Sequence, residues 1–442
     1  MTMRIVKGAD AIRRDLISRD IELATISEQD RCRASEVFGE DLSPREFVGR
    51  VMAQVRDDGD EALRRIGGKL GDYLPERLEL SCDDLATARA KAPTGLETDL
   101  KLAAERIRSF HQRQMPKNFF DKSAGLGQRW IAVGRAGLHI PSATGPLASS
   151  LLMTAIPARV AGVDEVIVCT GVTDEGIAPT IAVAAHLAEV DRVIAVSGAQ
   201  AIMAMALGTV SVPKCDAIVA PGNAWVMLAT REVFGLTGVS VLAGPTETLV
   251  IADLSADPAE VAADLIAQAE HGGPASPIVL TDDLALANQI ASHVQEQLIS
   301  LPKRETATES FSIRGGIGVV ADLEEAIGIS NEYGPEHLCL HVSEPDHLLG
   351  DVRNAGGVFI GSASPEVHGD YIAGPSHVMP TGGTARFSSP CGVHTFLKSM
   401  SLVQLGAEDS RQLAPIAARI ARSEGLEGHA RAAERRWSES HE

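Results

Sequence analysis

Short apolar runs alternate with amphipathic segments through most of the chain after Arg129. The runs are rich in Val, Ile, Leu and Ala, which is typical of strands buried on both faces of a parallel sheet. The segments between them are long enough for helices. This alternation predicts an α/β fold with two Rossmann-like α/β/α units, each built on a parallel sheet. The expected strands lie within 165–171, 192–198, 217–223, 278–283, 316–322, 339–342 and 357–362.

The clearest single helix is expected in the run 257–273. Asp257 suits the N-cap and Glu260 the third position of a capping box, while a Gly-Gly-Pro sequence ends the run. Gln268 and His271 are three residues apart, so they project from neighbouring positions on one side of the helix. These two side chains either close the end of a surface helix or supply half of a zinc site.

Polar residues at other predicted element ends are further candidates. Gln200 and Asn223 follow the carboxyl ends of expected strands, where parallel sheets bind ligands. Glu336 and His337 stand side by side just before a strand, as a salt-bridged loop or as an acid and an imidazole suited to proton transfer.

Two later segments carry the remaining candidates. Residues 364–389 are rich in Gly, Pro and Ser, and contain Asp370 and His377. A loop of this length is usually functional or disordered, and Asp370 is either a carboxylate ligand or a turn former. Glu424 and His429 lie in the tail, where a solvated helix is the simplest interpretation.

Composition narrows the class and the location of the protein. The net charge of −19 argues against nucleic acid and anionic membranes as partners, because both would require a basic surface. The six cysteines are scattered without a CxxC pair, so no disulfide framework is expected. No apolar run is long enough to span a bilayer and no secretory signal is visible, so we expect a cytoplasmic protein.

The order of the short motifs resembles that of the histidinol dehydrogenase family over nearly the whole chain. The motifs that carry this resemblance are FHQRQ, IPARVAGV, GAQAI, SVPK, PGNA, AGPTE, AQAEHG, YGPEHL, SPE-x-x-GDY, SHVMPT and EGL-x-x-H. The resemblance implies oxidation of L-histidinol to L-histidine through a bound aldehyde, with two hydride transfers to NAD. It also implies a homodimer with shared active sites.

The same resemblance assigns roles to the candidate residues. It implies one zinc ion per site held by Gln268, His271, Asp370 and His429, with the last ligand supplied by the tail of the partner subunit. Glu336 and His337 would be the catalytic pair, with His337 taking the alcohol proton and Glu336 activating water. Gln200 and Asn223 would contact NAD. The substrate would lie against the metal ligands and His337, and against Thr246, Glu424 and His377.

With this family in view, the chain is expected to divide into four parts. Residues 1–34 would be an N-terminal helical extension, and residues 391–442 a C-terminal helical tail that reaches the partner subunit. Residues 35–138 and 248–390 would form the first α/β domain, which carries the metal and catalytic residues. Residues 139–247 would form a second, nucleotide-binding α/β domain.

One departure from the family pattern lies at residues 139–143. Where the family commonly has Tyr followed by Ile or Val, Pro and two glycines, this chain has His139, Ile140, Pro141, Ser142 and Ala143. We expect His139 to be a weaker cofactor contact than the tyrosine ring.

The departure also keeps other functions open. The nearest alternative is an NAD- and zinc-dependent dehydrogenase acting on another amino alcohol or polyol. A zinc hydrolase and a non-catalytic binding protein are less favoured, because strand-end residues suited to a nucleotide and a complete acid–imidazole pair are both present.

Overall fold

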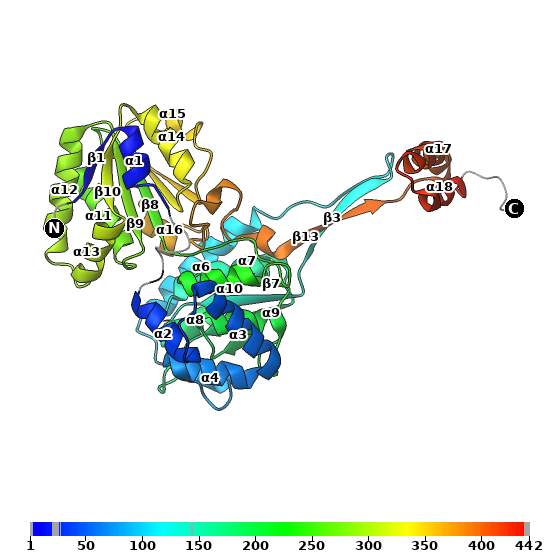
Figure 1. Cartoon of the computed structure of the whole chain (residues 1–442), viewed down its shortest axis with the longest axis horizontal. Helices are drawn as coiled ribbons and strands as arrows, with labels where there is room; N and C mark the ends of the chain where they lie inside the picture. The colour runs from blue at the N-terminus through cyan, green and yellow to red at the C-terminus, as the bar shows by residue number, and fades with distance from the viewer. Residues whose placement is uncertain (1–2, 20–25, 27, 143–144, 437–442) are drawn as a thin grey trace. The chain divides into compact units, whose positions relative to one another are not determined.

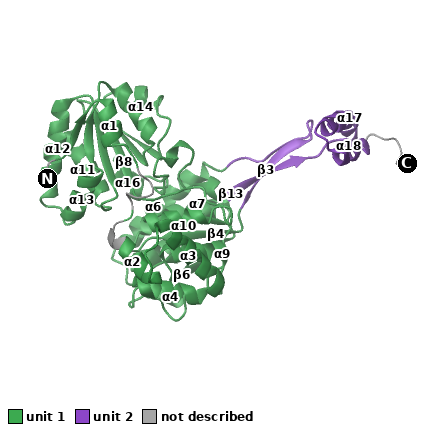
Figure 2. Ribbon diagram, viewed as in Figure 1, with its two compact units in different colours: residues 1–115, 133–396 green, residues 116–132, 397–442 purple. Residues whose placement is uncertain are grey.

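The computed structural model describes residues 3–19, 26, 28–142 and 145–436, and it divides the chain into two compact units (Figure 2). The first unit comprises residues 1–115 and 133–396, and the second comprises residues 116–132 and 397–442. Within the described residues, every helix is too short or too polar to cross a bilayer.

A six-stranded parallel sheet forms one part of the first unit, with the strand order β1-β10-β9-β8-β11-β12 (Figure 1). Side chains alternate between its faces, so Val250 packs on one side and its neighbours Leu249 and Ile251 on the other. Helices α11, α12 and α13 cover the first face, and α1 and α14 cover the second. The strands are β1 (Ile5–Lys7), β8 (Glu247–Ala252), β9 (Ser276–Thr281), β10 (Gly316–Val319), β11 (His337–His341) and β12 (Gly357–Ile360). The helices are α1 (Ala9–Asp15), α11 (Pro258–Ala269), α12 (Leu284–Leu298), α13 (Arg304–Ile313), α14 (Leu323–Tyr333), α15 (Pro345–Leu349) and α16 (Glu366–Tyr371).

A four-stranded parallel sheet forms the other part, with the order β6-β5-β4-β7. Helix α7 packs on β4 and β5, while α9 packs on β4 and β7. The strands are β4 (Arg135–Ile140), β5 (Glu165–Thr170), β6 (Arg192–Ile194) and β7 (Ala217–Val219). The helices are α2 (Glu28–Phe38), α3 (Pro44–Asp58), α4 (Asp60–Leu70), α5 (Cys82–Arg89), α6 (Leu96–Gln112), α7 (Ala148–Ala161), α8 (Pro179–Leu187), α9 (Gly198–Leu207) and α10 (Ala224–Glu232).

The predicted α/β class with two parallel sheets is confirmed, but the packing of several segments differs from the expectation. Residues 5–7 of the expected helical extension form β1, which pairs with β10 at the edge of the six-stranded sheet. Helices α3 and α4 belong to the core of the four-stranded sheet rather than to that of residues 248–390. Strand β4 also crosses the expected boundary at residue 139. The apolar face of an amphipathic helix is visible in the sequence, whereas the sheet that it covers is not.

The second unit contains antiparallel strands and two helices. Strand β3 (Leu126–Ala132) pairs with β2 (Phe119–Asp121) and with β13 (Leu397–Val403), so part of the expected helical tail is a strand. Helices α17 (Ala407–Ser423) and α18 (Glu427–Glu434) follow. The guanidinium of Arg422 joins them through ion pairs with Glu427 and Glu434, at 2.9 and 2.6 Å.

Candidate active site

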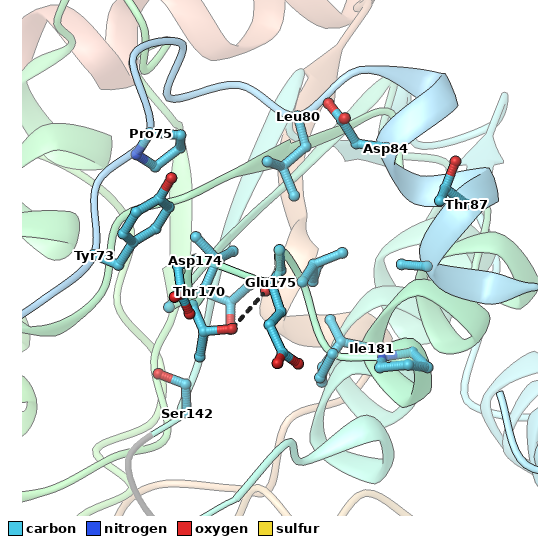
Figure 3. A pocket seen from close by; sticks show the side chains of 18 of the residues that line it. Tyr73, Pro75, Leu80, Asp84, Thr87, Ser142, Thr170, Asp174, Glu175 and Ile181 are labelled. Carbon is cyan, nitrogen blue, oxygen red and sulfur yellow. Dashed lines mark hydrogen bonds between the residues drawn. The ribbon is translucent and has the colours of Figure 1, made fainter. Parts of the chain in front are cut away.

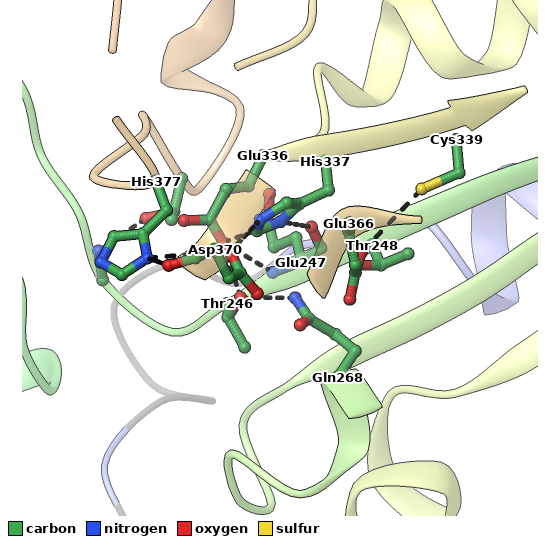
Figure 4. Close-up of polar contacts among 12 residues, drawn as sticks. Thr246, Glu247, Thr248, Gln268, Glu336, His337, Cys339, Glu366, Asp370 and His377 are labelled. Atoms are coloured by element: carbon green, nitrogen blue, oxygen red, sulfur yellow. Dashed lines mark hydrogen bonds and ion pairs between the residues drawn. The ribbon is translucent and has the colours of Figure 1, made fainter. Parts of the chain in front are cut away.

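Glu336 and His337 lie where the loop after α14 enters β11, and both side chains are buried (Figure 4). The Nδ1 atom of His337 lies 3.1 Å from the carbonyl oxygen of Glu247, so the ring donates from this nitrogen. Its Nε2 atom is buried without a hydrogen bond and lies 3.5 Å from Oδ1 of Asp370. The ring is therefore held by one nitrogen, and the other faces the polar cluster around it.

The carboxylate of Glu336 is held by two donors. One oxygen accepts from the hydroxyl of Thr246 at 2.7 Å and from the N–H of Glu247 at 3.0 Å. Burial raises the pKa of Glu336 to about 8, although the charge of His337 and these donors oppose the rise. A carboxyl group whose pKa lies near neutrality can take up and release a proton under ordinary conditions.

Charges around His337 act on its pKa in opposite directions. Burial lowers the pKa, but the carboxylates of Glu336, Glu366 and Asp370 outweigh it and raise the pKa to about 10. The aromatic ring of Phe359 stacks on the imidazole, with the ring centroids 5.7 Å apart. The surrounding carboxylates therefore favour the protonated form of the imidazole.

The buried carboxylate of Glu366, on α16, is a member of the cluster that sequence reasoning missed. It accepts from the hydroxyl of Thr248, and burial raises its pKa to about 7. The amide of Gln268 also contacts it, since this amide is satisfied when its nitrogen donates to Glu366 at 3.2 Å. The amide oxygen then accepts from the N–H of Glu247 at 3.1 Å. Glu366 is therefore in a position to orient Gln268, and its place in the motif SPE-x-x-GDY was the one available signal.

Asp370 and two histidines complete the cluster. The Nδ1–H of His377 donates to the carbonyl oxygen of Asp370 at 2.8 Å, and the Ser150 hydroxyl lies 2.9 Å from its other ring nitrogen. His271 is exposed in the turn after α11, rather than on the helix as predicted, because α11 ends at Ala269. Crowding by protein atoms still lowers its pKa, and the charge of Asp370 opposes this effect, so the two side chains are close enough to interact.

Helix α11 begins as predicted, but its cap differs in detail. The carboxylate of Asp257 accepts from the N–H of Ala259 at 2.8 Å, instead of from Glu260 as in a capping box. Pro258 occupies the first turn. The helix carries Gln268 one residue before its last residue, which places that amide in the cluster.

The expected zinc ligands fit that metal in donor type. Gln268, His271 and Asp370 provide an amide oxygen, an imidazole nitrogen and a carboxylate within one unit, and zinc accepts nitrogen and oxygen ligands. In the part of the chain that the structure describes, no group of three or more His, Cys, Asp or Glu side chains has the arrangement of a metal site. The expected set also includes an amide, from Gln268, and a residue of the second unit, His429, so the assignment of these four ligands stays a prediction.

The residues expected at the nucleotide lie at the carboxyl edge of the four-stranded sheet. Gln200 is buried near the start of α9, and its amide nitrogen donates to the carboxylate of Asp72 at 3.1 Å. The side-chain oxygen of exposed Asn223 caps α10 by accepting from Val226 N–H at 3.2 Å. Burial raises the pKa of Asp72, another residue that the sequence did not single out.

His139 has different surroundings from those expected at the rim of a site. It is 2% exposed on β4, and both ring nitrogens contact protein groups. Its neighbour Ser142 is exposed, and its side chain packs so closely over Gly171 that a Cβ there would collide with it. Ala143 lies outside the described residues. The role of His139 as a cofactor contact stays a prediction.

A cavity of about 710 Å³ opens at the same end of β5 (Figure 3). Ser142, Thr170 and Gly171 line it from the strand ends, and Tyr73 stands at its side. Asp174 lies in the turn that continues from β5. The cavity is of the size that small ligands and cofactors occupy.

Glu424 and His429 both lie in the second unit. Glu424 follows the last residue of α17, and His429 is in the first turns of α18. Both side chains are exposed, with the turn at Gly425 between them.

The comparisons with known proteins agree with one another. A family model described as histidinol dehydrogenase matches residues 39–437. The chain is 45% identical over 439 residues to histidinol dehydrogenase of Deinococcus radiodurans, which covers 98% of this chain and 100% of that protein. The identity to the Thermus thermophilus histidinol dehydrogenase is also 45%, over 397 residues that cover 88% of this chain and 94% of the relative. The solved structure of histidinol dehydrogenase from Elizabethkingia anophelis superposes with a TM-score of 0.88 at 30% identity, over 98% of both chains.

The fold, the buried acid–imidazole pair and these relatives define an oxidoreductase with two parallel α/β sheets. More specifically, the chain belongs to the histidinol dehydrogenase family. Its place in histidine biosynthesis follows from that membership.

Proposed function

We propose that this protein oxidises L-histidinol to L-histidine through the aldehyde, using two molecules of NAD and one zinc ion per site. The observation that carries the proposal is the buried pair of Glu336 and His337, in which Nε2 of the imidazole lies 3.5 Å from Oδ1 of Asp370. An alcohol dehydrogenation requires a base for the hydroxyl proton, and the second oxidation requires activation of water.

Each member of the pair has a separate role. The carbonyl of Glu247 fixes the orientation of the His337 ring and leaves Nε2 facing the cluster. The carboxylates around it favour the protonated ring, so Nε2 would receive the alcohol proton once a zinc ion beside Asp370 has offset that negative charge. Glu336 takes a proton from the water that adds to the aldehyde carbon. The hydroxyl of Thr246 and the N–H of Glu247 hold this carboxylate in place.

Two groups that bind to the protein complete the reaction. Zinc held by Gln268, His271, Asp370 and His429 of the partner subunit would orient the imidazole and amino groups of the substrate and oppose the carboxylate charge near His337. Gln200 and Asn223 would contact NAD, which accepts the hydrides. The cavity at the end of β5 and the amino ends of α9 and α10 support nucleotide binding at that edge.

The direct test mixes the purified protein with zinc, NAD and L-histidinol and follows the absorbance of NADH. The expected result is two NADH for each L-histidine formed. Release of L-histidinal with one NADH, or no reaction in the presence of bound zinc and NAD, would overturn the proposal.

The same-family alternative, a dehydrogenase of another amino alcohol or polyol, is tested in the same assay. Its basis is His139, which lies on the four-stranded sheet and contacts Gly198 at the start of α9 and Pro221 in the loop before α10. This departure therefore concerns the nucleotide side, whereas the Glu336 cluster keeps the motifs of the family apart from Thr246, where many members have Ser. The assay is repeated with a panel of amino alcohols and polyols. A kcat/KM for one of these compounds that exceeds the kcat/KM for L-histidinol would favour the alternative.

A homodimer with shared sites is the second part of the proposal. Helix α17 exposes an apolar stripe of Leu413, Ile416 and Ile420, which are 47%, 47% and 55% exposed. Such a stripe at helical spacing on a small unit fits burial against another chain. The unit's own buried positions on α17 and α18 are occupied only by alanines among the described residues.

Mixing two inactive variants tests the shared site. Asp370→Ala and His429→Ala should each lose activity, but a mixed dimer has one site with both defects and one with neither. Equal mixing should restore about a quarter of the parental activity, since half of the dimers are mixed and each has one intact site. Lack of recovery despite demonstrated subunit exchange would contradict the proposal.

A further inference from the structure

The imidazole of His139 joins two loops that are far apart in the sequence. Its Nδ1 atom lies 3.0 Å from the carbonyl oxygen of Pro221, in the loop after β7. The backbone N–H of Gly198, at the start of α9, donates to Nε2 at 3.1 Å. The Ser197 hydroxyl lies 3.3 Å from the same nitrogen.

These two backbone partners determine the protonation state of the ring. A carbonyl oxygen can only accept, so Nδ1 carries the proton; a backbone N–H can only donate, so Nε2 is bare. The protonated imidazole would place an N–H against the N–H of Gly198. Burial acts in the same direction, because it lowers the pKa of His139 to about 4.

His139 and its two partner loops lie at the point where the strand order of the four-stranded sheet reverses. Strands β5 and β6 extend the sheet from one side of β4, and β7 lies on the other side. The crevice at such a switch point is where open α/β sheets bind ligands. His139 spans it from β4, and the loops that it ties lead within two residues to Gln200 and Asn223.

We propose that His139 is a positioning residue, a neutral imidazole clamp that sets the spacing of the Gly198 and Pro221 loops and so aligns Gln200 and Asn223 for a nicotinamide dinucleotide. This role rests on the proposed function. A tyrosine cannot replace it, because one phenolic oxygen cannot occupy the places of two nitrogens on different sides of a ring. In this proposal His139 affects nucleotide binding by positioning the two loops, and not by contacting the nucleotide itself.

The clamp is tested first without nucleotide. Nitrogen-15 NMR of His139 should show the neutral ring with its proton on Nδ1 from pH 6 to 8. In His139→Phe, amide hydrogen exchange should accelerate in both segments, 197–204 and 221–226. Ser197→Ala is the matched control, because it removes a hydroxyl at the same nitrogen and leaves both ring-to-backbone bonds; its exchange should stay within about twofold of the parent.

The second readout is nucleotide binding. Calorimetry should show a dissociation constant for NAD about tenfold higher in His139→Phe, from the loss of two hydrogen bonds that hold the loops. The KM for NAD should rise while kcat at saturating NAD and the KM for the alcohol stay within twofold. His139→Asn, whose amide nitrogen lies near the position of Nδ1, should give an intermediate value.

The outcomes separate the clamp from the proposed function. Failure of the parent protein to bind NAD would overturn the proposed function, while the NMR and exchange results would still decide whether the clamp exists. NAD binding that is equal in the parent and in His139→Phe would overturn the positioning role. A proton on Nε2 in the parent protein would overturn the clamp, and this NMR test holds even if His139→Phe does not fold in quantity. Unchanged amide exchange in both segments of His139→Phe would also overturn it.

Discussion

The two parallel sheets of the first unit use opposite edges. Glu336 and His337 lie at the amino end of β11, with Thr246 just before β8. Gln200 and Asn223 lie beyond the carboxyl ends of β6 and β7. The candidate nucleotide residues thus follow the rule that ligands bind at carboxyl ends of strands, whereas the proposed catalytic pair lies at the amino end.

The direction of the helices gives a physical reason for the difference. Helices α11 and α14 end beside the Glu336 cluster, and a helix C-terminus carries partial negative charge that favours a metal ion or an imidazolium. Helices α9 and α10 begin beside Gln200 and Asn223, and a helix N-terminus offers free N–H groups to phosphate. Each edge suits the charge of the group proposed for it.

The two edges also differ in their own charges. The edge of the six-stranded sheet buries Glu336 and Glu366 beside His337 and raises the pKa of all three. The edge of the four-stranded sheet is held by His139, whose pKa burial lowers. The proposed proton transfer and the proposed loop positioning are thus assigned to different sheets, and the following predictions test that separation.

The largest effect is expected at Glu336. Glu336→Gln should lower the oxidation of L-histidinal by about 10³-fold, because activation of water requires a carboxylate. Oxidation of the alcohol should fall much less, since His337 takes that proton. NADH formation from each substrate measures the two steps. Glu332→Gln, an exposed residue paired with Arg13, should stay within about twofold. Equal losses in both steps would show that the roles are wrongly divided.

The neutral imidazole of His139 should affect how the free energy of unfolding depends on pH. The pKa of His139 falls from 6.5 to about 4 on folding, so between these values the unfolded state binds more protons and the free energy of unfolding decreases as the pH falls. The decrease in the free energy of unfolding begins near pH 6.5 and reaches about 3 kcal/mol by pH 4. Denaturant unfolding should show a shallower decrease in His139→Phe than in the parent. The same slope in both proteins would contradict a neutral His139.

The smallest effect is expected at Asp72, which fixes the amide of Gln200. Asp72→Ala should raise the dissociation constant for NAD about fivefold, through the loss of about 1 kcal/mol of hydrogen bonding. Alcohol proton transfer at the other sheet should be unchanged, so kcat at saturating NAD is the control. A fall in kcat without a change in NAD binding would mean that the two edges are not separate.

The sequence by itself determined the elements and much of the chemistry. Apolar periodicity predicted both parallel sheets, and Asp257 correctly marked the start of α11. Among the site residues, Thr246, Gln268, Glu336, His337, Asp370 and His377 lie together in the structure, while their roles stay predictions. Local spacing and short-range hydrogen bonding decide the helices and strands, so a linear pattern contains them, whereas these site residues come from segments remote in the chain.

Only the tertiary structure decided which segments share a sheet and what each side chain contacts. The sequence did not place β1 beside β10, or α3 and α4 on the four-stranded sheet, because an apolar face does not specify its partner. Nor did it indicate that Glu366 touches Gln268, or that His139 turns inward between Gly198 and Pro221. These contacts join residues remote in the chain, and their energies depend on burial that exists only after the sheets have formed.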